Sequence, residues 1–332
     1  MRNVSIELYR IFLMFGICLL HSITQGGNNV VWAANLFDWC VSGFVFLSGW
    51  FGIRFSFLKL IKLYCISFYC AACYVLFDVL MTGGLGSVNF VDIGIRCYRI
   101  AIGQWFLNAY VVLMCFAPIL NLACSQLVIS KWDYGQVRKC LQILGPLFVC
   151  VFGWSFATTL PIVGKLLPQS VGVTAYSFLM MLGVYTGARW LRLNDHWIRP
   201  LILKQKKFVI IGACVCLLAM CLGFEDYNSP FSFSFAAICF YAFNQVQVPQ
   251  KVGAVCVWLA PSMFSVYLMH SHGYAWDYLK CIESYLVGNR LPLSVVFLCT
   301  ASAIFGASVL LDMPRRFFIW GIQRFGGDTY GK

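Results

Sequence analysis

The sequence predicts an all-α integral membrane protein: a polytopic bundle of about ten transmembrane helices with both termini in the cytoplasm. Three observations lead to this prediction. First, 61% of the 332 residues are hydrophobic, only 11% are charged, and the mean hydropathy is +0.80, so a soluble globule would expose too much apolar surface. Second, apolar runs of about 20 residues, long enough to cross ~30 Å of hydrocarbon, recur along the chain. Third, the cations concentrate in alternate connecting segments.

The apolar runs define the expected spans in order. They cover residues 5–24, 30–53, 56–81, 104–124, 139–160, 173–190, 207–224, 230–247, 254–272 and 291–312. Turn-rich stretches separate several of them, including TQGGNN at 24–29, TGGLGSVN at 82–89, FEDYNSP at 224–230 and ESYLVGNR at 283–290. Irregular backbone cannot face lipid, and no alternating ten-residue pattern is present, so helices are favoured over a barrel. We expect one membrane domain covering residues 1–332.

The net charge of +12 reflects topology rather than nucleic-acid binding. If the N-terminus is cytoplasmic, most of the 24 Lys and Arg residues fall in inner segments, and Arg10 lies inside the first span. The outer segments hold Arg96, Arg99, Lys165, Lys280 and Arg290. This distribution follows the positive-inside rule.

The first span does not indicate signal-peptide cleavage, and the cysteines do not indicate a metal site. The first span is too long and too acidic at its start for a signal peptide, and no cleavage site follows, so we expect it to remain. Nearly all of the 17 cysteines fall in predicted spans, where a thiol is a small apolar packing group. Cys97 and Cys281 fall in loops on the same outer side, which leaves a pairing between them open.

Three ionisable residues lie in the first span: Glu7, Arg10 and His21. Eleven residues separate Arg10 from His21, which is about three helical turns plus ~20°, so both project from one face about 16 Å apart. Glu7 precedes Arg10 by three residues and is expected to pair with it. Charges at this depth are costly and are rarely kept without a partner or a task. The simpler interpretation is an insertion device plus an interfacial histidine.

Two further groups of polar residues suggest sites at opposite ends of the bundle. Arg54, Lys59 and Lys62 surround the inner end of the third span, where they either snorkel or bind a phosphate-rich cytosolic ligand. Tyr267 and His270 are one turn apart in the ninth span, and His270 is expected near the depth of His21. The two imidazoles either line one cavity, or His270 and His272 mark a wet helix end. Asp38 and Asp78 are weaker candidates for orienting a histidine.

Several segments resemble the acyltransferase family 3 membrane proteins. RNVSIELYRIFLMFGICLLHS is similar to the opening of that family, in which an Arg or Lys, ten residues and a His share the first helix; Arg10 and His21 fill this motif. VSGFVFLSGWF, with Ser48 and Gly49, resembles the second span. QWFLNAYVVLMCFAPIL, with Trp105 and Pro118, LGVYTGARW and SMFSVYLMH resemble later segments in the right order.

The resemblance implies an O-acyltransferase of the bacterial inner membrane that modifies cell-surface sugars. The donor would be acyl-CoA, with acetyl-CoA expected, and the acceptor a carbohydrate or lipid-linked glycan; metal and nucleic acid have no role. His21 and Arg10 would be catalytic, and Lys59, Lys62 and Arg54 would bind CoA. Supporting or acceptor-binding positions would be His270, Tyr267, Glu7, Ser48 and Trp105. Direct transfer to the hydroxyl and an acyl-histidine relay both fit these residues.

The chain also departs from the family pattern. Lys59 and Lys62 replace a common Arg pair, which keeps the charge but loses bidentate phosphate geometry. Gly103 stands where many relatives have His, and the short C-terminal segment leads us to expect a stand-alone transferase. A secondary transporter that uses Glu7, Arg10, Asp38 and Asp78 as a charged pathway is the alternative, although the spans do not divide into two similar halves. A non-catalytic scaffold is the third interpretation.

Overall fold

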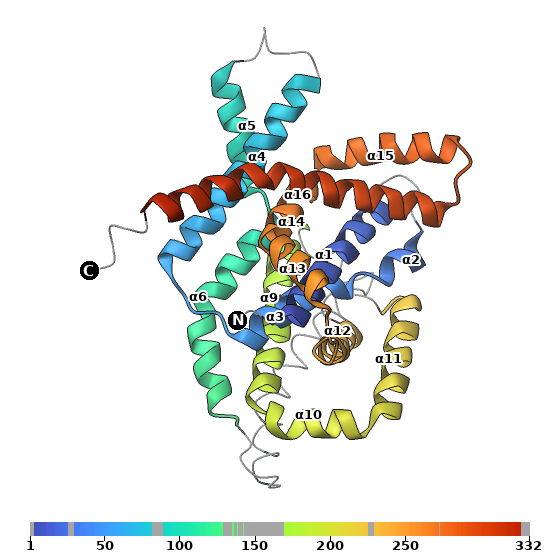
Figure 1. Ribbon diagram of the computed structural model, residues 1–332. Helices are drawn as coiled ribbons and strands as arrows, with labels where there is room; N and C mark the ends of the chain where they lie inside the picture. Colours follow the sequence, from blue (N-terminus) through green and yellow to red (C-terminus); the bar gives the residue numbers. More distant parts are fainter. Residues whose placement is uncertain are drawn as a thin grey trace.

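Helices form all the regular structure in the described part of a computed structural model of the protein (Figure 1). The structure describes residues 3–25, 30–81, 89–128, 169–224, 229–271 and 273–326, and the isolated positions 135, 138 and 142. The predicted span at 139–160 lies outside the described residues, apart from Gln142. The all-α prediction is confirmed for the described residues.

The helices follow the predicted spans, with shorter helices in the connections. In chain order they are α1 (Val4–Gln25), α2 (Val31–Asn35), α3 (Trp39–Phe51), α4 (Phe57–Met81), α5 (Phe90–Ile102), α6 (Trp105–Ser125), α9 (Gln169–Leu193), α10 (Asp195–Lys204), α11 (Lys206–Cys221), α12 (Pro230–Phe243), α13 (Gln250–Leu259), the 3₁₀ turn η2 (Ala260–Ser262), α14 (Met263–His270), α15 (Gly273–Gly288) and α16 (Leu293–Gly326).

Two predicted spans are interrupted. The run at 30–53 divides into α2 and α3, and the run at 254–272 divides into α13, η2 and α14. Pro261 lies in η2, where its ring and missing N–H prevent a regular α-helical turn. Hydropathy along the chain does not report such local breaks in a helix.

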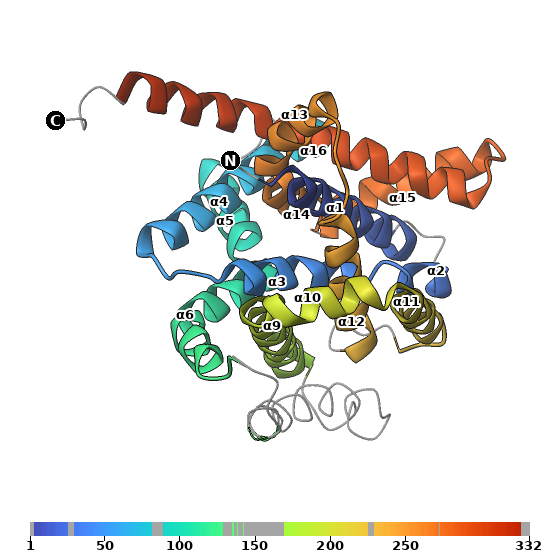
Figure 2. The ribbon, with the colours of Figure 1, turned by 60° about the horizontal axis from the view of Figure 1, so that its bottom comes forward.

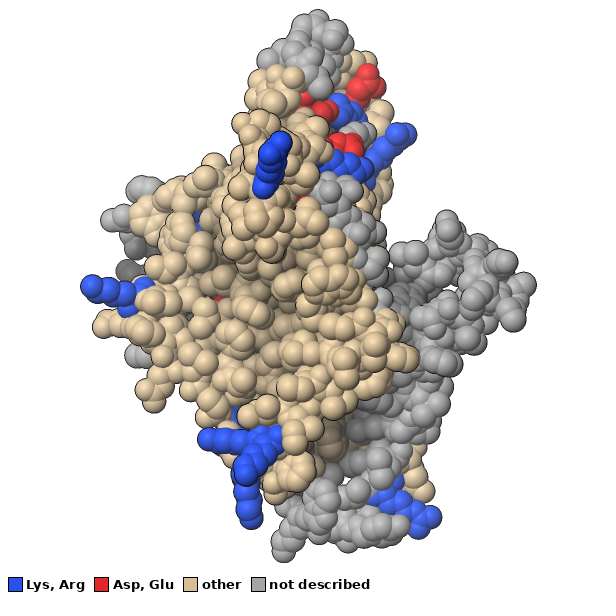
Figure 3. Space-filling model, turned by 90° about the vertical axis from the view of Figure 1, so that its right-hand side faces the viewer, with Lys and Arg blue, Asp and Glu red and all other residues tan. Residues whose placement is uncertain are grey.

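Five segments of the described chain are long and apolar enough to cross a membrane: Val4–Gln25, Phe57–Met81, Trp105–Ser125, Gln250–His270 and Leu293–Trp320. α3, α11 and α12 have 13, 16 and 14 residues, so each is shorter than a typical span. The ten-span count and the cytoplasmic termini therefore remain predictions. On the face shown in Figure 3, nearly all charged side chains lie toward the periphery around a broad uncharged area.

α1 occupies the centre of the molecule. It packs against α13, α14 and α16 on one side and against α3 and α12 on the other (Figure 2). Tyr9, Leu13 and Cys18 of α1 are fully buried, and Tyr9 donates a hydrogen bond to the Ala236 carbonyl at 2.9 Å. The helix that carries Glu7, Arg10 and His21 is thus largely buried by neighbouring helices.

Candidate active site

One face of α1 carries the polar residues of the first span. Arg10 Nη1 donates to Glu7 Oε2, so the predicted ion pair is confirmed. Glu7 is 6% exposed, and burying its carboxylate without a partner would be unfavourable. Arg10, Met14 and Ile17 line one cavity, and His21 follows on the same face one turn further.

Arg10 lies where two neighbouring cavities meet. The first, here called the basic vestibule, has a volume of about 510 Å³ and is lined on one side by Arg54, Lys59 and Lys62. The second, the inner chamber, has a volume of about 320 Å³ and extends between α1, α3, α6 and α14 to Tyr267. Both cavities share Arg10, Phe44, Ser48, Leu63, Tyr110 and Phe264. The two therefore form one route from a cationic entrance to an aromatic interior.

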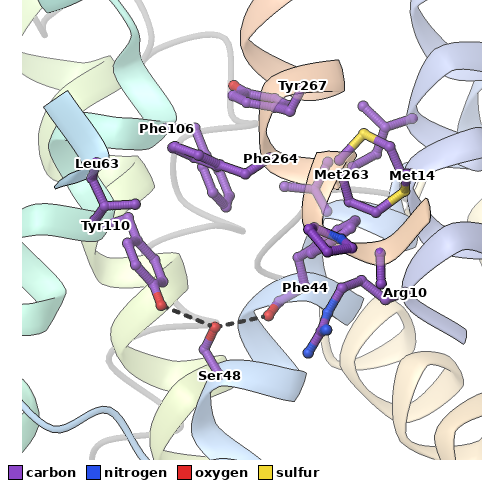
Figure 4. A pocket seen from close by; sticks show the side chains of 14 residues that line it. Arg10, Met14, Phe44, Ser48, Leu63, Phe106, Tyr110, Met263, Phe264 and Tyr267 are labelled. Atoms are coloured by element: carbon purple, nitrogen blue, oxygen red, sulfur yellow. Dashed lines mark hydrogen bonds between the residues drawn. The ribbon is translucent and has the colours of Figure 1, made fainter. Parts of the chain in front are cut away.

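Polar groups of α3 and α6 line the junction of the two cavities (Figure 4). Ser48 Oγ donates to the Phe44 carbonyl at 3.1 Å and lies 3.4 Å from the Tyr110 hydroxyl, with which it shares a hydrogen bond. Arg10 projects toward the same junction from α1 (Figure 4). The junction thus combines a cation with two hydroxyl groups in otherwise apolar surroundings.

A backbone turn holds the cations at the entrance. α3 ends at Gly52, whose φ of +74° is a conformation that residues with a Cβ rarely adopt. The next residue, Ile53, donates its N–H to the Tyr185 hydroxyl at 2.9 Å and accepts from Asn121 Nδ2 at 3.0 Å. Tyr185 in turn donates to Asn121 Oδ1 at 2.8 Å. Side chains of α6 and α9 therefore position the segment that carries Arg54, Lys59 and Lys62.

His21 and His270 are brought together beyond the inner chamber. Their ring centroids are 4.9 Å apart, and Trp276 lies 6.4 Å from the His21 ring. His270 is 2% exposed, and its Nδ1 bonds to the Val266 carbonyl. Because a carbonyl can only accept, this nitrogen carries the hydrogen, which leaves Nε2 as the acceptor of a neutral ring. Neither His270 Nε2 nor His21 Nδ1 has a hydrogen-bond partner within the described part of the chain.

α14 links the histidine pair to the inner chamber. Tyr267, at the far end of the chamber, lies one turn before His270, with ring centroids 6.1 Å apart. Gln104 secures the end of this helix, because Ser271 Oγ donates to its side-chain oxygen at 2.9 Å and its Nε2 donates to the Leu268 carbonyl at 3.5 Å. Arg10 and Tyr267 thus line the inner chamber, and the two histidines lie one helical turn beyond Ile17 and Tyr267 of its lining.

A comparison with protein families identifies the family. A family model described as an acyltransferase domain matches residues 3–313. The chain belongs to acyltransferase family 3. Neither a search of curated proteins nor a search of solved structures gave a significant match. With its apolar helices, this acyltransferase is an integral membrane protein.

Six of the predicted site residues of this acyltransferase line the two cavities, namely Arg10, Ser48, Arg54, Lys59, Lys62 and Tyr267, whereas Glu7, His21, His270 and Trp105 do not. Trp105 packs on Phe106 with ring centroids 5.7 Å apart but is not among the residues that line either cavity. Phe106 does line the inner chamber, and its ring lies 5.1 Å from that of Tyr267. A supporting role for Trp105 stays a prediction, since the sequence does not tell which of these two neighbouring aromatic residues faces the chamber.

Two other expectations are changed by the structure of the acyltransferase. Asp78, considered for orienting a histidine, forms an ion pair with Arg96. Cys97 and Cys281 are free thiols, so the possible pairing between them is not formed. Among the described residues, no group of three His, Cys, Asp or Glu side chains is placed to hold a metal ion.

Sequence reasoning missed Tyr110, Asn121 and Tyr185, which shape the junction and the entrance of the acyltransferase. Asn121 is a polar residue within an apolar run and so gave a weak signal. The two tyrosines were hidden among 16 tyrosines in a chain that is 17% aromatic. Only their tertiary contacts distinguish them.

Proposed function

We propose that this acyltransferase moves an acetyl group from cytosolic acetyl-CoA to a hydroxyl of a surface polysaccharide or lipid-linked sugar in a bacterial inner membrane. The observation that carries the proposal is the pair of adjoining cavities that lead from the basic vestibule, past Arg10, to Tyr267, whose ring lies 6.1 Å from that of His270 in the His21–His270 pair. A donor with a highly charged end and a reactive group on a long arm matches such a path.

The vestibule suits the nucleotide end of CoA. Lys59 and Lys62 are exposed and one helical turn apart, and Arg54 lines the same cavity. Lysine is a mobile point charge that binds phosphate without demanding a fixed geometry. In this proposal these three residues hold the CoA phosphates, while the pantetheine arm passes Arg10 and Ser48 into the inner chamber.

The histidine pair supplies the acid–base chemistry. His21 takes the proton of the acceptor hydroxyl as its oxygen attacks the thioester carbonyl carbon. The C–S bond then breaks, and the imidazolium returns the proton to the departing thiolate, so that CoA leaves as a thiol. A general base in this role contributes roughly 10²- to 10⁴-fold in rate. In this proposal His270, whose buried Nε2 has no hydrogen-bond partner in the described chain, and Tyr267 position the sugar hydroxyl and the thioester.

The alternative mechanism, an acyl-histidine relay, and the alternative function, transport, predict different experimental results. In an acyl-histidine relay, His21 would itself carry the acetyl group, and a labelled protein would accumulate when acceptor is withheld. A transporter would use Glu7 and Arg10 as a charged pathway, whereas in the structure they pair with each other. Substrate accumulation in vesicles without CoA would favour the transporter.

The test is acyl transfer by purified protein in nanodiscs, with radiolabelled acetyl-CoA and a membrane glycan extract. We expect the wild type to label glycan and His21→Ala to lose about 10²-fold or more in rate. Lys59→Ala/Lys62→Ala should raise the KM for acetyl-CoA about tenfold, because two exposed ionic contacts are together worth roughly 1–2 kcal/mol.

The matched control is Lys204→Ala/Lys207→Ala. These two lysines are also exposed and three residues apart, but they are not among the lining residues of the vestibule. The KM of this variant for acetyl-CoA should therefore match that of the wild type. Full activity of His21→Ala would disprove its catalytic role. An equal rise of KM in both lysine variants would show that only the overall charge matters.

A further inference from the structure

A third cavity lies on the other side of α14 from the inner chamber. It has a volume of about 380 Å³ and is enclosed by α4, α15, α16 and the end of α14. None of its lining residues is shared with the basic vestibule or the inner chamber. We call it the apolar groove. Its walls include Cys70, Phe77, Leu279, Ile304, Ala307 and Leu311.

The lining of the groove is mostly apolar, and its polar members include His270, Tyr74, Tyr278 and Ser308. Its described lining residues include no Lys, Arg, Asp or Glu. The His270 side chain is 2% exposed, and its Nε2 is buried without a hydrogen-bond partner in the described chain. A buried polar nitrogen without a partner is unfavourable, so the arrangement calls for a ligand with a hydrogen-bond donor beside His270.

The position of the groove indicates that its ligand comes from the bilayer. α4 and α16 are both candidate membrane spans. Phe77, Ile282 and Leu311 of its lining are 43%, 41% and 46% exposed, so an apolar rim faces outward. Figure 1 shows α15 and α16 side by side above the region where α14 meets α4. A hydrocarbon chain in the membrane can enter such a groove without crossing water.

We propose that the apolar groove holds the hydrocarbon chain of a lipid-linked acceptor and presents the hydroxyls of its sugar to the histidine pair. The proposal rests on the acyl-transfer function and narrows the acceptor to a membrane-anchored one. One sugar hydroxyl donates to His270 Nε2 while its neighbour, the reacting hydroxyl, meets His21, whose ring lies 4.9 Å away. Donor and acceptor then approach the pair from opposite sides of α14.

The charges distinguish the two ligands. CoA needs cations for its phosphates, and Arg54, Lys59 and Lys62 line the vestibule and not the groove. A phosphatidylcholine chain would fill the groove, but its head group has no N–H or O–H to donate to His270 Nε2. An acceptor with a chain and a hydroxyl-bearing head satisfies both the apolar lining and His270 Nε2.

The first experiment measures binding without activity. A dodecyl glucoside with a diazirine at the chain end is photolysed with the protein in nanodiscs, and labelled peptides are mapped by mass spectrometry. We expect label in the groove segments of α4, α15 and α16, reduced at least about tenfold in Ala303→Trp/Ala307→Trp, whose indoles fill the groove. Ala307→Leu should give an intermediate reduction.

Ser302→Trp is the matched control, since Ser302 is an exposed small residue of the same helix outside the groove lining. The Ser302→Trp variant should be labelled in the groove segments to the same extent as the wild type. Its thermal stability should equal that of the groove variants. Equal labelling of the filled variant and the control would overturn the proposal. So would a diazirine phosphatidylcholine that labels the groove as strongly as the glucoside does, because the site would then be an ordinary lipid contact.

The second experiment measures selectivity. The membrane glycan is offered in its lipid-linked form and after mild acid has removed the lipid. We expect the wild type to show a KM at least about tenfold lower for the lipid-linked form, and Ala303→Trp/Ala307→Trp to lose this preference with an unchanged KM for acetyl-CoA. An equal KM for the lipid-linked and the lipid-free glycan would refute the groove assignment but not the acyl-transfer function. Groove labelling with no transfer to either glycan would refute acyl transfer and leave chain binding intact.

Discussion

Glu7 and Arg10 are the residues on which the cationic side of the path depends. The carboxylate of Glu7 is buried, whereas the Arg10 side chain is 31% exposed and lines both the vestibule and the inner chamber. Glu7 therefore offsets the charge of Arg10 from the protein side and leaves the guanidinium facing the route of the donor. Their spacing of three residues was enough to predict the pair.

Removing only one partner of the Glu7–Arg10 pair should destabilise the protein more than removing both partners. Arg10→Ala leaves a buried carboxylate without its cation, and breaking a buried pair in this way costs about 3–5 kcal/mol, with the lower end expected for a partly exposed arginine. Arg10→Ala/Glu7→Ala should therefore unfold at a higher temperature than Arg10→Ala, as measured by tryptophan fluorescence in one detergent. A double variant whose loss equals the sum of the two single losses would show that the two charges do not interact.

At the scale of elements, the connection between α3 and α4 determines where the donor enters. Its backbone is held at Ile53 by Tyr185 from α9 and Asn121 from α6, which closes a ring of hydrogen bonds of 2.9, 3.0 and 2.8 Å. Neither Tyr185 nor Asn121 is among the lining residues of the basic vestibule. Tyr185 and Asn121 are thus positioning residues for Arg54, Lys59 and Lys62.

Tyr185→Phe should raise the KM for acetyl-CoA with little change in kcat. The variant loses both hydrogen bonds of the Tyr185 hydroxyl, each worth about 0.5–1.5 kcal/mol, and a combined loss of roughly 1–3 kcal/mol corresponds to a change of about 5- to 150-fold if all of it falls on donor binding. Tyr69→Phe is the control, because Tyr69 donates to the Leu311 carbonyl at 2.7 Å and does not contact the entrance. If Tyr185→Phe lowered kcat instead, the tyrosine would act on the chemistry and not on the entrance.

The packing of α3 on α9 depends on Gly49. A Cβ added at this position would lie 2.3 Å from the Tyr185 carbonyl oxygen and 2.9 Å from the Ala188 Cβ, so the two helices would have to separate. We expect Gly49→Ala to lower the free energy of unfolding by about 1–3 kcal/mol. Gly94→Ala in α5 meets no atom within 4 Å and should leave stability equal or slightly higher. Equal thermal midpoints for both variants would argue against this contact.

At the scale of the whole molecule, α1 is the most buried of the five candidate spans, and the other helices surround it. A first helix with an ion pair and a histidine can be stable in a membrane protein only when neighbouring helices shield these groups from lipid. The helix that carries the proposed catalytic groups is therefore also the helix that the bundle has to enclose.

The predicted topology can be tested with reporter fusions in a bacterial host. Because most cations lie in the segments expected inside, a fluorescent protein fused after Lys332 should fluoresce in the cytoplasm. Alkaline phosphatase inserted after Asn289, in the turn before α16, should be active outside. An inactive phosphatase there, with the C-terminal reporter fluorescent, would mean that α16 does not cross the membrane.

The sequence by itself determined the class of the protein, the family and the spacing of its chemistry. Hydropathy depends on composition along the chain, and the motif of Arg10 and His21 depends on helical periodicity, so both can be read without a structure. Tertiary structure alone decided that His21 meets His270, that Phe106 and not Trp105 faces the inner chamber, and that Tyr185 holds the entrance. These contacts join residues far apart in the chain through the packing of helix faces. In a chain where most faces are apolar, the pattern does not mark which face turns inward.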